Sequence, residues 1–247
     1  MSLWRLEWLR LVRTRRWVGP TAIYLLFGLL GPLTARYLGE LLASVGGIEV
    51  VLPDPTPADG FAQYVANVSQ LGILAVVVVA ASSLSIDRPV EMGVFLRTRV
   101  RRTADLVIPR VVTMSALAVG AWVLGALAAW YEVTILLGPA DAAAVLAGTA
   151  YGAVHLVFVV TLVAALSARG GSTMTTTLSA VAVLLSLPLL ALVPAVERWV
   201  PSELVGALDA MVAGASLTRP LPAAGVALAL SALSIAFAIR RLGVTEP

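Results

Sequence analysis

The stretch that decides the fold is residues 142–166, which read AAAVLAGTAYGAVHLVFVVTLVAAL. It contains no Asp, Glu, Lys or Arg. An α-helix needs about 20 apolar residues to cross the hydrocarbon core of a bilayer, and this stretch is long enough. The sequence therefore predicts that these residues form a transmembrane helix.

Five more apolar segments of similar length surround this one. The chain is 60% hydrophobic and 13% charged with a mean hydropathy of +0.95, whereas a soluble domain carries about 25% charged residues. We therefore predict an all-α integral membrane protein whose residues 18–247 form a single domain of six transmembrane helices. The predicted spans are 18–38, 64–84, 110–131, 142–166, 174–194 and 221–239.

Charged residues are distributed unevenly between the two sides of these spans. With the N-terminus inside, fourteen Arg lie inside and three outside, whereas five acidic residues lie inside and nine outside. Short Arg-rich loops stay in the cytoplasm, so both termini are predicted to be cytoplasmic. No cleavable signal is evident, so the first span is expected to be retained. Arginine in place of lysine, with much Ala, Val, Leu and Gly, indicates a high-GC genome and hence a bacterial cell membrane.

Composition also excludes several kinds of chemistry. The chain has no Cys, so disulfides and thiolate metal sites are excluded. It has no Lys, which excludes a Walker A phosphate loop and Lys-based Schiff-base chemistry. The net charge of +3 comes from residues at span ends, which indicates contact with anionic lipid and not with nucleic acid.

Two segments outside the spans are predicted to be helical. In residues 1–17, Trp4, Trp8, Leu11 and Val12 share one helical arc, which predicts an amphipathic helix in the cytoplasmic membrane interface. A frayed basic tail is the alternative. Residues 202–217 repeat apolar residues at helical spacing and predict a short helix on, or dipping into, the outer membrane face. A loop helix packed on the protein surface is the alternative there.

The cytoplasmic loop 85–109 between the second and third spans contains an unusual pattern. Two acidic residues precede Gly93, an apolar pair (Phe95 and Leu96) follows, and an Arg cluster leads into the third span. Ordinary positive-inside charge explains the arginines but not the apolar residues among them. A short helix with an apolar face and a charged rim suits the groove of a cytoplasmic partner, and a membrane-surface helix is the competing interpretation.

With its six spans and amphipathic N-terminal helix, a chain carrying this loop resembles an ABC-2-type transporter permease. That family's loop usually has an acidic–basic pair, a Gly-Thr, a Leu-rich turn, a Pro before an Arg, and a Gly-Lys that opens the third span. Here Asp87-Arg88 and Glu91-x-Gly93 match, whereas Val94 replaces the Thr. Residues 99–102 stand where Pro and Arg are usual, and residues 109–110 replace Gly-Lys. The segment 202–217 is similar to the family's re-entrant helices.

The resemblance implies a mechanism with several chains. Two permease subunits, identical or different, would form an export path, and each would bind a separate ATP-binding cassette ATPase subunit through the loop. ATP and Mg would bind to that partner, and this chain would hold no cofactor, no metal and no catalytic residue. The residues implied in ATPase coupling are Asp87, Glu91, Gly93, Phe95, Leu96, Arg97, Arg99, Arg101 and Arg102.

Polar residues inside the spans are the candidates for contact with a substrate. Spans 1, 2 and 5 carry most of them, and simple hydrogen bonding between helices is the alternative role. The candidates for a translocation path are Tyr24, Thr34, Asn67, Gln70, Thr177 and Ser186. His155, the single histidine, lies inside the fourth span, where a hydrogen-bonded packing role is favoured over a site.

Three other classes of membrane protein make demands that can be compared with this sequence. An intramembrane hydrolase needs a Ser–His pair or a metal site, and one His without Cys or buried acids provides little for either. A secondary carrier would show inverted repeats or intramembrane charge, and neither is evident. A structural or assembly membrane protein without transport activity stays open as the alternative to a permease.

Overall fold

The computed structural model describes residues 3–46, 53–84 and 102–244, and all secondary structure in these residues is helical. Six helical segments are long and apolar enough to cross a membrane, which confirms the predicted all-helical fold with six candidate spans. The helices are α1 (Leu3–Arg13), α2 (Val18–Gly46), α3 (Pro57–Asn67), α4 (Ile73–Leu84), α6 (Thr103–Leu136), α7 (Ala142–Ser167), α8 (Thr173–Leu190), α9 (Ala207–Val212) and α10 (Leu221–Val244).

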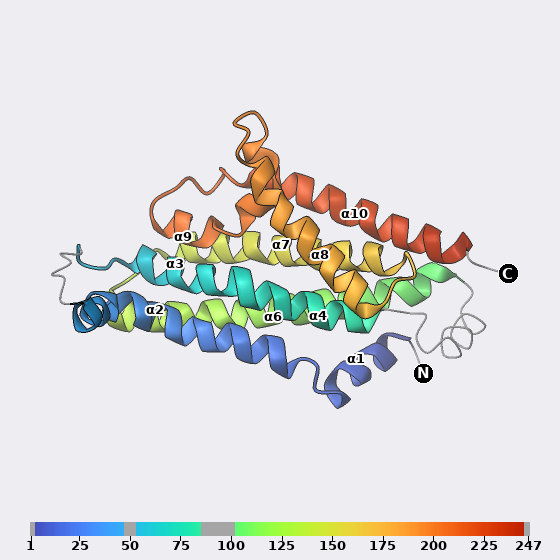
Figure 1. Ribbon diagram of the computed structural model, residues 1–247, viewed down its shortest axis with the longest axis horizontal. Helices are drawn as coiled ribbons and strands as arrows, with labels where there is room; N and C mark the ends of the chain where they lie inside the picture. The colour runs from blue at the N-terminus through green and yellow to red at the C-terminus, as the bar shows by residue number, and fades with distance from the viewer. Residues whose placement is uncertain (1–2, 47–52, 85–101, 245–247) are drawn as a thin grey trace.

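The long helices form a bundle, and several helix ends lie together at one end of it. Helices α2, α3, α4, α6 and α7 run side by side along the long axis, and α1 and the last turns of α10 lie at the same end (Figure 1). The end of α4 and the start of α6 lie at that end too (Figure 1). The even number of candidate spans accounts for the position of α1 and the end of α10 at one end of the bundle.

The second candidate span begins earlier than predicted and contains a π-helical turn. Helix α3 starts at Pro57, and the carboxylate of Asp59 accepts hydrogen bonds from the backbone N–H and the hydroxyl of Thr56 at 2.8 and 2.7 Å. Proline fits the first position of a helix because its missing N–H would have no partner there. The π-helical turn Val68–Gly72 joins α3 to α4 and occupies the polar part of the predicted span.

The third span also begins earlier than predicted. Helix α6 starts at Thr103, so residues 103–109, which were predicted to belong to the cytoplasmic loop, are helical. Asp105 lies in the first turn, where a negative charge stabilises the helix dipole. Leu106 and Val107 are buried and continue the apolar face of the helix.

Three aromatic rings hold the centre of the bundle together. The Trp122 ring stacks on Tyr64 at a centroid distance of 5.3 Å and meets the Tyr24 ring edge-on at 6.2 Å. The Tyr64 hydroxyl donates to the Trp122 carbonyl at 3.2 Å, and the Trp122 indole N–H donates to the Thr149 carbonyl at 2.8 Å. These contacts join α2, α3, α6 and α7.

Glycines allow the backbones around this cluster to approach one another. A Cβ atom on Gly125 would lie 2.6 Å from the Tyr24 carbonyl oxygen, and one on Gly28 would overlap the Gly125 carbonyl oxygen. The Trp122 ring similarly occupies the space that a side chain on Gly152 would need. Small residues permit close helix contact in membranes, where van der Waals packing replaces the hydrophobic effect between helices.

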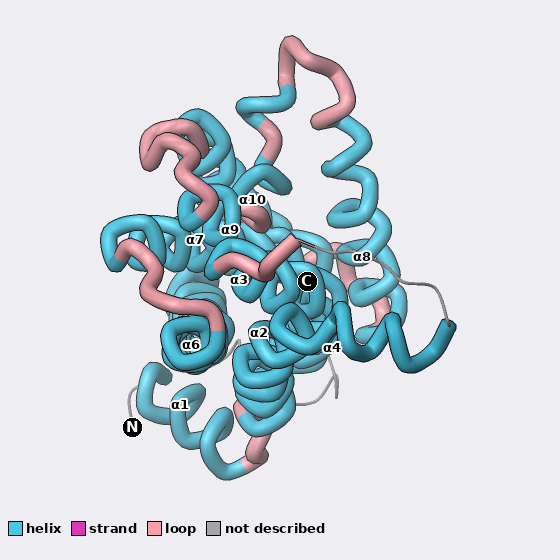
Figure 2. Tube along the Cα trace, turned by 90° about the vertical axis from the view of Figure 1, so that its left-hand side faces the viewer, coloured by secondary structure: helices cyan, strands magenta, loops and turns pink. Residues whose placement is uncertain are grey.

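Helix α8 is attached more loosely. It lies at the side of the bundle (Figure 2), and only 11% of the residues in its apolar stretch are buried. Met174, Leu178 and Leu185 are each more than half exposed. This helix therefore presents an apolar surface to its surroundings.

The predicted helix 202–217 is divided in the structure. Pro201–Leu204 form a 3-10 turn (η3), and α9 covers only Ala207–Val212. Gly206 lies between them, and Gly214, with φ +98°, ends the helical segment. The predicted apolar face is nonetheless buried: Leu204, Leu208 and Met211 are each at most 3% exposed, and Leu208 packs over Gly148 of α7.

Candidate functional site

Most of the predicted coupling residues lie outside the described part of the chain. These are Asp87, Glu91, Gly93, Phe95, Leu96, Arg97, Arg99 and Arg101. Arg102 is described, and it is exposed immediately before the first residue of α6. The structure covers the whole of the neighbouring helices α1, α4 and α6.

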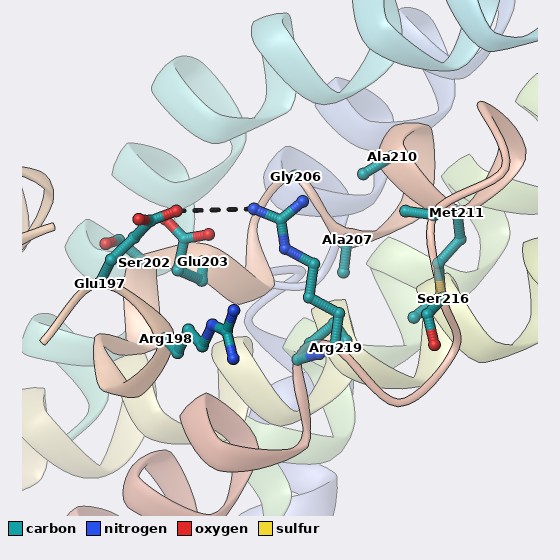
Figure 3. A pocket seen from close by; sticks show the side chains of 12 residues that line it. Glu197, Arg198, Ser202, Glu203, Gly206, Ala207, Ala210, Met211, Ser216 and Arg219 are labelled. Carbon is teal, nitrogen blue, oxygen red and sulfur yellow. Dashed lines mark hydrogen bonds and ion pairs between the residues drawn. The ribbon is translucent and has the colours of Figure 1, made fainter. Parts of the chain in front are cut away.

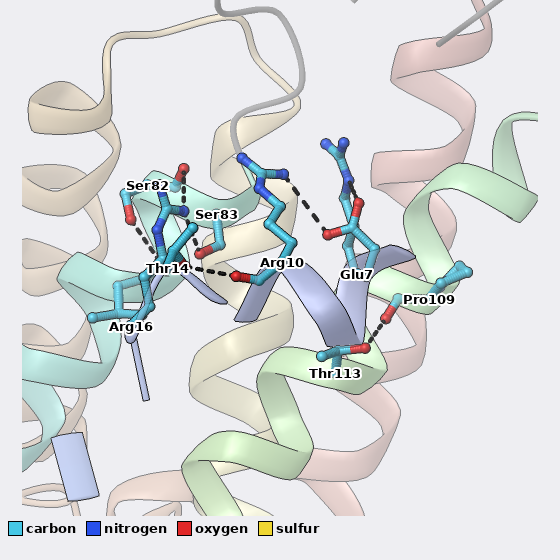
Figure 4. Close-up of polar contacts among 10 residues, drawn as sticks. Glu7, Arg10, Thr14, Arg16, Ser82, Ser83, Pro109 and Thr113 are labelled. Carbon is cyan, nitrogen blue, oxygen red and sulfur yellow. Dashed lines mark hydrogen bonds and ion pairs between the residues drawn. The ribbon is translucent and has the colours of Figure 1, made fainter. Parts of the chain in front are cut away.

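A buried ion pair fastens α1 to α6. The Nε–H of Arg110 donates to the Glu7 carboxylate at 2.8 Å, and the two residues are 4% and 8% exposed. Arg10 lies 3.7 Å from the second oxygen of the same carboxylate (Figure 4). Breaking a buried pair of this kind is costly because it leaves one charge without a partner. The pair therefore fixes α1 to the first turns of α6.

Arg16 connects the same segment to α4. Its guanidinium donates to the Ser83 hydroxyl at 3.0 Å and to the Ser82 carbonyl at 3.4 Å (Figure 4). Burial, and then the positive charge of Arg10, lower the pKa of Arg16 from its ordinary value. Residues 3–16 thus contact both helices that flank residues 85–101.

The faces of α1 have separate roles. Leu11, on the side of Glu7, is 7% exposed, whereas Trp4, Trp8 and Val12 are each about half exposed. The apolar arc predicted from the sequence is therefore divided between contact with the bundle and exposure. The turn after α1 contains Arg15 in the left-handed region at φ +52°.

The predicted path residues are not brought together. Tyr24 is 1% exposed and belongs to the central aromatic cluster. Asn67 donates to the Gln63 carbonyl of its own helix at 2.8 Å. Gln70 alone among the six lines a large groove. The hydroxyls of the other three donate to carbonyls one turn back in their own helices: Thr34 to Leu30, Thr177 to Thr173 and Ser186 to Val183.

The groove lies between the π-helical turn, α8 and η3, and has a volume of about 760 Å³. Its walls are mainly apolar and include Ile73, Leu74, Leu184 and Leu187. Glu203 is the single charged residue among its lining residues in the described chain. Ligand-binding cavities in proteins commonly have volumes of about 300–1,000 Å³, so the groove is large enough for an organic molecule.

His155 forms part of the groove wall from α7. Its Nδ1 lies 3.1 Å from the Pro201 carbonyl oxygen, which can only accept a hydrogen bond. The proton of the neutral imidazole is therefore on Nδ1, and Nε2 is left as an acceptor. This bond between α7 and η3 agrees with the packing role favoured for His155.

A smaller polar pocket of about 180 Å³ adjoins the groove. Glu197, Arg198, Glu203 and Arg219 bring their charged groups around it (Figure 3). Arg219 pairs with Glu197 at 3.5 Å. Ser202 and Glu203 line both the pocket and the groove.

Sequence reasoning missed the residues that define these sites. Glu7 is the only acidic residue in segment 1–17, and that isolation was a usable signal. Its partner Arg110 was predicted to be a cytoplasmic arginine in the pair 109–110 that opens the third span, and not a member of a buried ion pair. Arg198 and Glu203 gave no sequence signal, because their significance depends on the path of the chain around α8.

Comparison with protein-family models, curated proteins and solved structures finds no match to this chain. Among the described residues, no group of three His, Asp or Glu side chains has an arrangement that could hold a metal ion.

Proposed function

We propose that this chain is the transmembrane permease subunit of an ATP-driven ABC transporter that exports its substrate across the bacterial cell membrane. In this proposal both termini are cytoplasmic, two permease subunits form the path, and each binds an ATP-binding cassette ATPase subunit. ATP and Mg bind to that partner chain. The structural or assembly protein is the alternative.

One observation carries the proposal: residues 3–16 contact both helix ends that flank residues 85–101. Glu7 forms an ion pair with Arg110 of α6, and Arg16 donates a hydrogen bond to Ser83 of α4. In this proposal, a displacement of residues 85–101 moves the end of α4 and the start of α6. Because residues 3–16 are bonded to both of these helices, α1 moves with them. That arrangement suits a loop that receives force from an ATPase.

The charge distribution adds support. The basic end of the bundle contains Arg5, Arg13, Arg169, Arg240 and Arg241, as a cytoplasmic end requires. The exposed Trp4 and Trp8 suit an interfacial position for α1, with their rings at headgroup depth. Segment 197–219 then lies on the outer side.

Energy for transport is assigned to the partner because the spans offer little for proton coupling. Proton relays use chains of carboxylates and imidazoles inside the membrane. Arg110 is neutralised by Glu7, and His155 is hydrogen-bonded to a backbone carbonyl. The absence of lysine from the sequence excludes a P-loop on this chain.

Purification of the protein from its native membrane in a mild detergent tests the proposal. We expect an ATP-binding cassette subunit to co-purify, and Phe95→Asp to release it while the protein still inserts. Leu217→Asp is the matched control, since Leu217 is an exposed apolar residue on the proposed outer side. Retention of an active ATPase by Phe95→Asp would show that the coupling residues are wrongly assigned.

A further inference from the structure

The polar pocket and the apolar groove adjoin at Ser202 and Glu203, which line both of them. A molecule that occupies both must therefore have a polar head and an apolar body. The residues that line each cavity indicate more closely which class of ligand fits it.

The four charged groups of the pocket sum to zero, and two of them are paired. Arg219 binds Glu197 at 3.5 Å. Within the described chain, Arg198 and Glu203 have no ion-pair partner, and both line the pocket. One free cation and one free anion complement a head group that carries both signs. A head group with only a negative charge would face Glu203 without compensation.

Besides Glu203, the polar residues His155 and Ser202 line the groove and suit a ligand with a hydrogen-bond donor. His155 donates its Nδ1–H to the Pro201 carbonyl, so its Nε2 can only accept a hydrogen bond. The Ser202 hydroxyl is buried and has no hydrogen-bond partner among the described residues. A buried polar group without a partner destabilises the protein, and a bound head group can supply one after a change of rotamer.

The location suits a ligand that arrives from the bilayer. The segment between α8 and η3 extends from the side of the bundle (Figure 1), and the adjoining face of α8 is exposed and apolar. The groove walls from α4 and α8 provide Leu74, Leu184 and Leu187 for contact with acyl chains.

We infer that pocket and groove together form a binding site for a zwitterionic phospholipid with a primary amine. The phosphate faces Arg198, the ammonium faces Glu203, and an acyl chain lies in the groove along α8. The lipid bound at this site would belong to the substrate class of the proposed exporter, and this assignment as a substrate rests on the proposed function.

Photo-labelling tests the site on the full chain in a non-ionic detergent. Two lipids with the same diazirine-bearing acyl chain are compared, one with a phosphoethanolamine head and one with a phosphoglycerol head. We expect the ethanolamine lipid to label α8 near Leu184 and Leu187 about tenfold more strongly, the ratio for one charge-assisted hydrogen bond.

Variants identify the two charged partners. Glu203→Gln should reduce labelling by the ethanolamine lipid to the level of the glycerol lipid, and Arg198→Gln should reduce labelling by both. Glu132→Gln and Arg36→Gln, which remove the same charges elsewhere on the outer side, should change neither. Arg198 is exposed, so its variant keeps the test available if Glu203→Gln folds poorly.

Equal labelling by both lipids, or labelling that Glu203→Gln leaves unchanged, would overturn the inference and leave the groove as a surface for bulk acyl chains. Because no ATPase is present, that failure leaves the permease proposal intact. Loss of ATPase co-purification with lipid selectivity retained would instead remove the permease proposal and keep the lipid site.

Discussion

Helices α6 and α8 are both predicted spans, yet they contact the bundle in different ways. The backbones of α2 and α6 approach so closely that Gly28 and Gly125 have no room for a side chain, and the Trp122 ring of α6 fills the space beside Gly152 of α7. Along α8 a groove of about 760 Å³ separates the helix from the π-helical turn and η3. The contrast shows that α2, α6 and α7 form a closely packed scaffold, whereas the α8 side has space for a ligand.

The largest expected effect concerns the anchor of α1 on this scaffold. Glu7→Gln leaves the Arg110 charge buried without its partner, which should cost about 3–5 kcal/mol. Arg10→Gln, which removes the longer and more exposed contact, should cost less than about 1 kcal/mol. Thermal unfolding in detergent, together with the rate of trypsin cleavage within α1, checks both values. Equal effects of the two variants would mean that the Glu7–Arg110 pair does not hold α1.

A second experiment compares two glycines of α6. Gly125→Ala places a methyl group 2.6 Å from the Tyr24 carbonyl oxygen, and overpacking of this kind typically costs about 1–3 kcal/mol. Gly120→Ala meets nothing within 4 Å and should raise stability by up to about 1 kcal/mol through helix propensity. Melting temperatures that shift in the same direction would contradict the close crossing of α2 and α6.

On the α8 side, substitutions should alter binding more than stability. Leu184→Trp fills part of the groove and should change stability by less than about 0.5 kcal/mol while abolishing labelling by the ethanolamine lipid. Leu189→Trp is the control, because Leu189 is 65% exposed and does not line the groove. A large loss of stability in Leu184→Trp would show that α8 is packed as tightly as α6.

The smallest effect concerns Asp209 in α9. Burial raises the pKa of its carboxyl, although backbone hydrogen bonds oppose the shift. An acid with a raised folded-state pKa makes the protein more stable as the pH falls through that value. Asp209→Asn should therefore be slightly more stable than the natural protein at neutral pH, and the difference should shrink as the pH falls through the raised pKa and be lost by about pH 4, the ordinary pKa of an Asp in the unfolded chain. A pH-independent difference would exclude ionisation of Asp209 as the cause.

Apolar runs predicted the six spans because each needs only local information about length and composition. The helix limits were less accurate. The second and third spans were predicted to begin at residues 64 and 110, yet a proline at a helix start and a negative charge in a first turn favour the earlier starts at Pro57 and Thr103. The segment 202–217 has helical spacing, but Gly206 and Gly214 divide or end it.

The candidate sites were less predictable than the spans. Glu7 and Arg110 are 103 residues apart, and His155 and Pro201 are 46 residues apart. Such pairs depend on how whole helices pack, which hydrophobic periodicity does not encode. Polar residues in the spans were interpreted as path or interhelical groups, whereas Thr34, Thr177 and Ser186 form hydrogen bonds within their own helices.

ATP hydrolysis by the protein purified from its native membrane tests the central claim most directly. We predict that the co-purified complex hydrolyses ATP, that the isolated chain does not, and that Phe95→Asp removes the activity together with the ATPase subunit. Movement of a labelled lipid across a vesicle membrane against its concentration gradient by the isolated chain, or a chain that purifies without any ATPase, would contradict the account.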